Sequence, residues 1–551
     1  MASKPPARAP RKRRAPPRER AVLDSAHVGD IRGAFGTIGQ NDSERRRSWR
    51  ARTFALLAII GPGLIVMVGD NDAGGVATYS QAGQNYGLSL MWVLLLLIPV
   101  LLVNQEMVVR LGAVTGVGHA KLIFERFGRF WGLFSVGDLF LLNFLTIVTE
   151  FIGVSLSLSY FGVANYVSVP IAAVLLVAIT ASGSFRFWER AMFMFVAANF
   201  LAIPLFVLAH PHVGAVAGHF VIPGIEGGAN STSVLLIIGL VGTTVAPWQL
   251  FFQQSNVIDK RITPRWINYE RLDTWIGAFV VVLGAAALMA VSAFAFHHTR
   301  YFGHFKDAGK TASALDHVLG PVAGAFFAIV LLNASLIGAG ALTLSTSYAF
   351  GDVFGTKSSL HRSFADAKAF YGTFSLLIAG AAAIVLIPHA PLGVITLAVQ
   401  ALAGVLLPSA TVFLLLLCND REVLGPWRNP GWLNVLASVI VATLVLLSMI
   451  LMATTVFPHV NVTAITLGGG VALAGGLIAF AIATLRSRRG AAAVTVEEPA
   501  STIPKEQWTM PPLAFLARPQ WSTGRKVSML TLRGYLAVSI VLLIVKAVQL
   551  G

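Results

Sequence analysis

The chain has 551 residues, of which 56% are hydrophobic and only 12% are charged. Soluble proteins carry about 25% charged residues, so this composition excludes a soluble globular enzyme, a disordered protein and a fibre. The single cysteine, Cys418, excludes a disulfide framework and a thiolate metal cluster. The apolar residues come in blocks of about 20, the length that crosses a ~30 Å hydrocarbon core. The sequence therefore predicts an all-α polytopic membrane protein.

The N-terminal segment 1–52 holds more than half of the net charge of +16, with 14 Lys/Arg and 5 Asp/Glu. Taken alone, this basic run could indicate nucleic-acid binding. Beside a membrane domain, its basic residues and prolines favour a disordered cytoplasmic tail near anionic lipid. We therefore expect no nucleic-acid partner. We also expect no cleaved signal peptide, since no apolar segment with a small-residue cleavage site follows at the required distance.

Thirteen apolar segments are candidates for membrane spans. They lie at 53–83, 87–112, 133–162, 168–183, 190–210, 233–258, 273–296, 320–350, 370–388, 391–418, 432–456, 461–485 and 533–550. Basic and non-basic loops alternate: loop 259–272 has four Lys/Arg and loop 211–232 has none, although loop 297–319 is an exception with three. The positive-inside rule places the N-terminus in the cytoplasm. The odd last span would place the C-terminus outside.

Polar residues interrupt the first span. Asp70, Asn71 and Asp72 lie in its middle, and Gly74 and Gly75 then disfavour a continuous helix. Ionisable groups at membrane depth are costly and usually functional. Non-helical backbone survives there only inside protein or beside a water-filled cavity. Carboxylates and freed carbonyls at that depth suit a hard cation; the alternative is a solvated loop between two short spans.

The sixth span is interrupted as well. Pro247 lacks a backbone donor and clashes with the preceding turn, and it pushes Ala246 out of the α region. The break frees the carbonyl of Thr243. In isolation this could be a simple proline kink. Because the first and sixth spans are five spans apart, the two interruptions together indicate a binding site at the midplane of an inverted repeat.

Other polar residues lie within or beside spans. Glu106 and Arg110 are four residues apart on one helix face, as in a structural ion pair near the cytoplasmic end or a route for ions or protons. Glu150 in the third span could relay protons or attract cations. Gln400 in the tenth span could make an interhelical hydrogen bond or contact an ion.

Several motifs resemble one known family. They are Gly61-Pro62-Gly63, Gly69-Asp70-Asn71-Asp72-Ala73-Gly74-Gly75-Val76-Ala77-Thr78, Arg110-Leu111-Gly112-Ala113-Val114-Thr115-Gly116, Leu407-Pro408 and Asn419-Asp420-Arg421-Glu422-Val423-Leu424-Gly425. Through these motifs, the stretch 55–485 resembles the natural resistance-associated macrophage protein (Nramp) family of divalent-metal transporters. On that register Asp72 matches the signature aspartate, a metal ligand in the family.

The resemblance implies the leucine-transporter-like fold, in which two inverted repeats of five helices have discontinuous helices 1 and 6. The expected parts are the tail 1–52, the repeats 53–210 and 233–418, spans 11 and 12 within 432–485, a cytoplasmic linker 486–532 and an additional C-terminal span 533–551.

The chain departs from the family pattern at the expected metal site. The signature Pro is Ala73 and the signature Asn is Gly75, so Asp70, Asn71 or waters would have to replace one oxygen ligand. The family's sixth-span Met is Ala246. A thioether favours softer metals, whereas Mg²⁺ prefers oxygen ligands and keeps several waters. This pattern is similar to the Nramp-related magnesium transporter branch.

The residues for proton coupling also differ. The best register places Glu150 at the family's third-span Asp and Gly153 at its Glu, while Trp248 stands at the sixth-span His. The resemblance therefore implies uptake without strict proton coupling.

The sequence predicts a transporter that imports Mg²⁺ or Mn²⁺ across the cytoplasmic membrane by alternating access. The expected metal site comprises Asp72, Asp70, Asn71, Thr243, Ala246 and Gln400, and the expected ion or proton pathway comprises Glu150, Glu106 and Arg110. We expect no enzyme, because neither a Walker loop nor a GxSxG elbow occurs, and no cofactor. Two alternatives remain: an organic-solute permease of the same fold, and a non-transporting receptor or scaffold.

Overall fold

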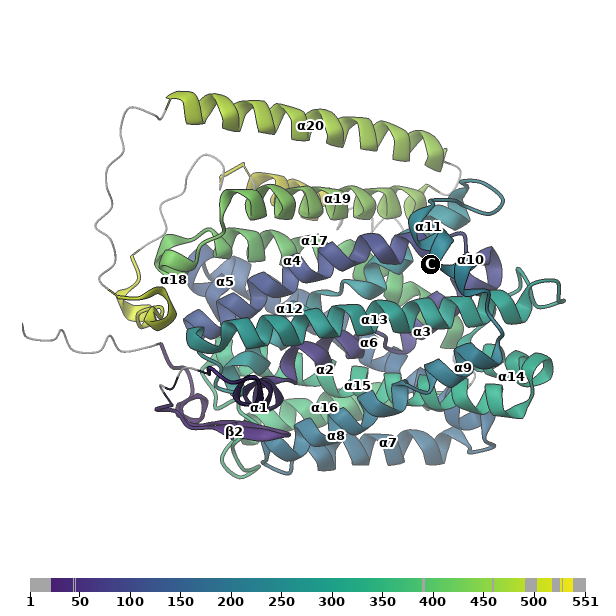
Figure 1. Ribbon diagram of the computed structural model, residues 1–551, viewed down its shortest axis with the longest axis horizontal. Coiled ribbons are helices and arrows are strands. Elements are labelled where there is room, and N and C mark those ends of the chain that lie inside the picture. Colours follow the sequence, from purple (N-terminus) through teal and green to yellow (C-terminus); the bar gives the residue numbers. More distant parts are fainter. Residues whose placement is uncertain are drawn as a thin grey trace, which may run out of the picture.

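The computed structural model describes residues 21–42, 44, 46–388, 392–457, 460–490, 503–517, 526–527 and 529–538. These residues form one bundle of long helices (Figure 1). The first half of the bundle comprises α2 (Pro62–Gly69), α3 (Ala73–Tyr86), α4 (Met91–Thr115), α5 (His119–Phe127), α6 (Arg129–Tyr160), α7 (Asn165–Thr180), α8 (Phe185–Asn199) and α9 (Ala202–Leu208).

The second half comprises α11 (Ser231–Thr244), α12 (Pro247–Asp259), α13 (Ile267–Phe296), α15 (Pro321–Phe354), α16 (Lys368–Val385) and α17 (Leu392–Cys418). α19 (Gly431–Val456) and α20 (Val462–Gly490) follow at one edge of the bundle (Figure 1). Short elements lie in the connections: α10 (Val213–Val221), η2 (Pro264–Trp266), α14 (Ala308–Leu319), α18 (Arg421–Leu424), η3 (Gly425–Trp427), η4 (Lys505–Gln507) and η5 (Leu513–Phe515).

Nine helices in the described part of the chain are long and apolar enough to cross a membrane. The first predicted span, 53–83, contains a bend that the sequence did not predict, since its start lies in the helix α1 (Trp49–Ile59), which is bent by 52° from α2. Gly61 stands at the bend with a φ of +152°, a region that favours glycine. A Cβ there would lie 2.1 Å from Oε1 of Glu189, so the close approach also requires glycine.

α15 and α6 are the most extensively packed pair of helices in the described part of the chain. The middle of α15 contains the small residues Gly338, Ala339, Gly340 and Ala341, all of them buried. Small residues let the backbones of neighbouring membrane helices approach closely. This close packing brings α15 against the two broken helices described below.

The N-terminal segment differs from the prediction of disorder throughout 1–52. Within it, residues 21–38 form the 3₁₀ turn η1 (Ser25–His27) and a hairpin of β1 (Ile31–Gly33) and β2 (Gly36–Ile38). The hairpin packs on the bundle because Ile31 and Ile38 bury their side chains against it. Residues 1–20 lie outside the described residues.

The predicted linker 486–532 is also partly folded onto the bundle. α20 extends to Gly490, and Met510 is buried with its N–H donating to the Val114 carbonyl at 3.0 Å. The start of the predicted C-terminal span is helical, and Tyr535 lies 2.5 Å from Ser448 (hydroxyl to hydroxyl). The rest of that span, 539–551, lies outside the described residues.

The basic loops meet the N-terminal segment at one end of the bundle. Arg186 donates to the Gly33 carbonyl at 3.1 Å, and Arg261 donates to the Ala26 carbonyl at 2.9 Å. The sequence assigns the sides of the membrane from loop charge alone, and the fold brings these basic loops together with the N-terminal segment.

Candidate functional site: two broken helices

The two predicted interruptions face each other inside the bundle. The first separates α2 from α3 at residues 70–72, and the second separates α11 from α12 at residues 245–246. Gln249 on α12 donates to the carboxylate of Asp70, and its own amide oxygen accepts from Gln105 at 3.0 Å. A 2.7 Å hydrogen bond between the hydroxyls of Tyr79 and Thr244 joins α3 to α11. The breaks therefore form one polar site between the halves of the bundle.

Asp72 caps the N-terminus of α3. Its Oδ1 accepts the backbone N–H of Gly75 at 2.7 Å, and the side chain is buried. A helix N-terminus stabilises negative charge, which lowers the cost of holding a carboxylate at this depth. The local sequence explains the geometry, since Asp is a favoured N-cap residue and Gly75 leaves space for its carboxylate.

Glu150 approaches Asp72 from α6. Its Oε2 accepts the backbone N–H of Ala73 at 3.1 Å, and its Oε1 has no hydrogen-bond partner among the described residues. A Cβ added to Gly338 on α15 would lie 2.7 Å from Oε2 of Glu150 and 3.0 Å from Cβ of Asp72. Both acidic residues therefore surround the same point, and Gly338 leaves them that space.

The oxygens around the breaks are only partly satisfied. Oδ2 of Asp70 and Oγ1 of Thr243 are buried without a hydrogen-bond partner in the described part of the chain. The Thr243 carbonyl cannot receive the usual bond from four residues on, because Pro247 has no N–H. Ala246 is the N-cap of α12 and is buried. Unsatisfied buried oxygens are costly unless a ligand or water completes them.

Few charged groups are available to bind a metal ion here. In the described residues, no group of three or more His, Cys, Asp or Glu side chains could hold one. An ion at this site would thus be bound by one or two carboxylates, with carbonyls, hydroxyls or its own waters completing the shell. That arrangement matches a hard cation that keeps part of its hydration.

The structure places Asn71 differently from its two neighbours. Its amide nitrogen donates to the Val281 carbonyl on α13 at 3.0 Å, and its Oδ1 has no partner among the described residues. Asn71 lines a mostly apolar cavity of about 360 Å³ beside α9, α10 and α13. Its side chain is thus held by α13, whereas Asp70 is held by α12.

Two other predicted residues, Glu106 and Arg110, bond to partners other than the two acids. Both oxygens of Glu106 are engaged, one by Arg110 at 3.0 Å and one by Arg271 at 2.5 Å. Arg110 also donates to the Trp427 carbonyl at 2.6 Å. These contacts favour a structural ion pair between Glu106 and Arg110 over a route for ions or protons. Gln400 lies in α17, and its side chain is outside the described residues.

Position 153 has no space for a second acid. A Cβ on Gly153 would lie 2.2 Å from Oγ of Ser335 and 2.6 Å from Cβ of Ala73. Glu150 is therefore the acid that α6 contributes beside Asp72.

Sequence reasoning missed the role of Gln249. The sequence analysis assigned this side chain no role, yet it bridges the two breaks. Gln249, Gln253 and Asn256 recur at intervals of four and three residues, which places them on one helix face. That periodicity in a membrane span was the available signal.

A match to a protein-family model decides which family the chain belongs to. The model described as natural resistance-associated macrophage protein-like matches residues 63–454. The chain belongs to the Nramp family. This confirms the resemblance found in the motifs, and the matched range covers both broken helices and extends into α19.

Similar proteins share the family and the fold. The divalent metal cation transporter MntH of Xylella fastidiosa (strain Temecula1) is 28% identical over 448 residues, 78% of this chain and 89% of that protein. MntH of Burkholderia ambifaria is 30% identical over 296 residues, 51% of this chain and 65% of that protein. The crystal structure of the Eremococcus coleocola manganese transporter aligns with a TM-score of 0.63 at 21% identity, covering 80% of this chain and 97% of that one. The predicted leucine-transporter-like fold of this Nramp protein is thereby confirmed.

Proposed function

We propose that this Nramp protein is a secondary transporter that imports a divalent cation across the cytoplasmic membrane by alternating access. The meeting of the two helix breaks around Asp72 carries the proposal. The names of the MntH relatives and of the manganese transporter agree with it. The multi-pass fold, with its basic loops on the side of the N-terminus, supports a cytoplasmic N-terminus.

The donor set favours Mg²⁺ or Mn²⁺ over softer metals. Asp72 supplies the charge, Asp70 and the Thr243 carbonyl supply oxygens, and Gln400 is proposed to contact the ion or its waters. Ala246 offers no sulfur ligand, so nothing at that position selects softer ions. An organic acid is disfavoured, because Asp70 and Asp72 would repel its carboxylate.

Replacing Asp72 by alanine is expected to lower Mg²⁺ and Mn²⁺ influx by more than about tenfold, because it removes the charged ligand. Influx would be measured in liposomes that contain the purified variant. Asp366→Ala is the matched control, since Asp366 is exposed in the loop after α15. Full retention of both fluxes by Asp72→Ala would reject this site.

Replacing Ala246 by methionine is expected to raise Cd²⁺ influx relative to Mg²⁺ influx by about tenfold, the effect of ~1.4 kcal/mol of added ligand stabilisation. A thioether at the start of α12 would supply a soft ligand. The assay compares Mg²⁺, Mn²⁺, Fe²⁺ and Cd²⁺ with and without a pH gradient. Ala246→Leu, which has similar bulk but no sulfur, is the control. An equal Cd²⁺ response in both variants would contradict the role proposed for the missing sulfur.

Proton coupling is proposed to be weak in this Nramp protein. Glu150 has no second acid beside it, because position 153 is Gly153. Trp248, which cannot titrate, stands where the Nramp family has its sixth-span His. The same influx assay tests this point. A metal flux that follows the pH gradient closely would overturn it.

A further inference from the structure

The folded N-terminal segment 21–38, here called the latch, joins parts of the bundle that are distant in the sequence. It contacts the end of α12, the loop 355–367 between α15 and α16, the start of α8 and the helix α1. α12 is one half of the second broken helix, and α1 leads through the bend at Gly61 to α2, which is one half of the first. The latch thus touches the end of α12, the helix α1 that precedes α2, and the continuous helix α8. Figure 1 shows β2 beside α1 and α8.

One end of the latch is fixed by Asp24. Arg362 in loop 355–367 donates from Nε to both carboxylate oxygens at 2.9 Å, and the backbone N–H of Ser358 donates to Oδ2 at 3.1 Å. Burial raises the pKa of Asp24, but the hydrogen bonds from Arg362 and Ala26 and the charge of Arg362 outweigh it and lower that pKa to about 2. The carboxylate is therefore charged at neutral pH.

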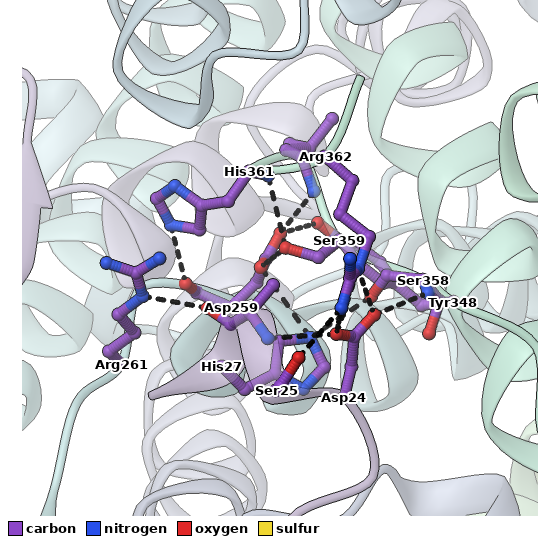
Figure 2. A network of polar contacts seen from close by, with 12 residues as sticks. Asp24, Ser25, His27, Asp259, Arg261, Tyr348, Ser358, Ser359, His361 and Arg362 are labelled. Atoms are coloured by element: carbon purple, nitrogen blue, oxygen red, sulfur yellow. Dashed lines mark hydrogen bonds and ion pairs between the residues drawn. The ribbon is translucent and has the colours of Figure 1, made fainter. Parts of the chain in front are cut away.

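The latch also covers the C-terminal end of α12. Asp259, the last residue of α12, accepts from Tyr348 at 2.6 Å and from the Leu360 N–H at 2.8 Å. His27 of the latch lies 3.0 Å from the Ser358 carbonyl and 3.6 Å from Asp259. Figure 2 shows these side chains converging from the latch, α12, α15 and loop 355–367. Asp259 is consequently enclosed between the latch and α15.

The hairpin of the latch is held at the other broken helix. The Ala34 N–H donates to Glu189 of α8 at 2.5 Å. Glu189 also binds Lys260 at 2.5 Å, and Lys260 donates to the Ile60 carbonyl at the bend between α1 and α2 at 2.8 Å. A Cβ on Gly33 would lie 2.0 Å from the Ala58 carbonyl of α1. The hairpin is thus in direct contact with the element that precedes α2.

We propose that residues 21–38 latch the cytoplasmic side of the transporter shut, and that release of the Asp24–Arg362 contact is required for this side to open. The proposal rests on the alternating-access function proposed above. In that mechanism the inner half-helices α2 and α12 move against the continuous helices. A segment bonded to both groups must lose its contacts with at least one of them when they move apart. Those contacts therefore stabilise the closed state.

The seam between α2 and α12 provides a place to detect opening. Asn256 lies on the face of α12 that carries Gln249, Gln253 and Lys260, which bond to Asp70, Thr274 and Ile60 respectively. Both polar side-chain atoms of Asn256 are buried and have no partner among the described residues. A side chain with unmet hydrogen bonds on this face would gain water if the two half-helices separated. Asn256 is therefore a suitable position for a reporter cysteine.

The test measures labelling of Asn256→Cys in a Cys418→Ser background. A membrane-impermeant maleimide is added to the cytoplasmic side of inside-out vesicles, and the labelling rate is followed. Arg362→Gln and Asp24→Asn should each raise the rate by about tenfold, the effect of losing a charge-assisted hydrogen-bonded pair. Arg362→Lys, which keeps the charge but not the two-pronged contact, should give an intermediate rate.

Asp42→Asn is the matched control, because among the described residues the Asp42 carboxylate bonds only within the N-terminal segment, to Arg46 and to the Glu44 N–H. Its labelling rate should equal that of the unmodified background. Equal rates in Arg362→Gln, Asp24→Asn and the background would overturn the latch. If Arg362→Gln does not yield folded protein, Asp24→Asn and Arg362→Lys decide the question. The labelling needs no metal transport, so a failed latch and a failed transport proposal give different results.

Discussion

Replacing Gly338 by alanine is expected to abolish divalent-cation influx while the protein still folds. The added Cβ would lie 2.7 Å from Oε2 of Glu150, closer than real Cβ contacts allow, and 3.0 Å from Cβ of Asp72, which is tighter than most such contacts. One of the two acids must then move away from the position where the helix breaks meet. Overpacking of this kind costs about 1–3 kcal/mol in stability, but a small displacement of a ligand costs far more in activity.

Gly340→Ala is the control for this prediction. Gly340 lies on the same helix, yet a Cβ there would meet its nearest neighbour, Sδ of Met192, at an ordinary 3.7 Å. We expect Gly340→Ala to transport normally. Influx in liposomes and the melting temperature in detergent should be measured for both variants. If Gly338→Ala transports as well as Gly340→Ala, the acids are not confined as the fold indicates.

The two broken helices could be predicted because their signals are local. A carboxylate, a Gly pair or a Pro in an apolar span contradicts its surroundings, and the contradiction is visible within ten residues. The same contrast gave thirteen candidate spans, whereas nine helices in the described part of the chain are long and apolar enough to cross a membrane. The bend at Gly61 was missed because apolar residues run across it from α1 into α2, and hydropathy does not register a change in helix direction.

The partners of the polar residues could not be predicted in the same way. Gln249 and Asp70 are 179 residues apart in the sequence, and no pattern in either segment specifies the other. The lack of space at Gly153 likewise arises from Ser335 on α15. Such contacts are set by the packing of whole helices, so the sequence indicated which residues are polar but not which of them meet.

The folding of residues 21–38 was missed for a related reason. Its strands have three residues each, shorter than strands that are stable alone, and a strongly basic stretch precedes them. Its order comes from distant partners, such as Arg362 for Asp24, 338 residues away. A segment that folds only against another surface has no local periodicity from which to predict it.

Replacing Lys260 by methionine is expected to destabilise the protein by about 3–5 kcal/mol, the cost of leaving one partner of a buried ion pair uncompensated. Lys260 and Glu189 are both fully buried at 0% exposure and lie 2.5 Å apart. Among the described residues, the single variant leaves the buried Glu189 carboxylate with the Ala34 N–H as its one remaining partner. The double variant Lys260→Met/Glu189→Gln removes that charge and should recover much of the loss. Thermal unfolding in detergent at neutral pH measures both.

Lys121→Met provides the matched control for the loss of a lysine. Lys121 pairs with Glu125 at 3.1 Å, but Glu125 is 37% exposed, and exposed pairs contribute about 0–1 kcal/mol. We expect its melting temperature to stay close to that of the unmodified protein. A similar small change in Lys260→Met would mean that water reaches Glu189 in the folded state. Because Lys260 also bonds to Ile60 at the bend before α2, that result would imply that the cytoplasmic ends of the broken helices are already apart.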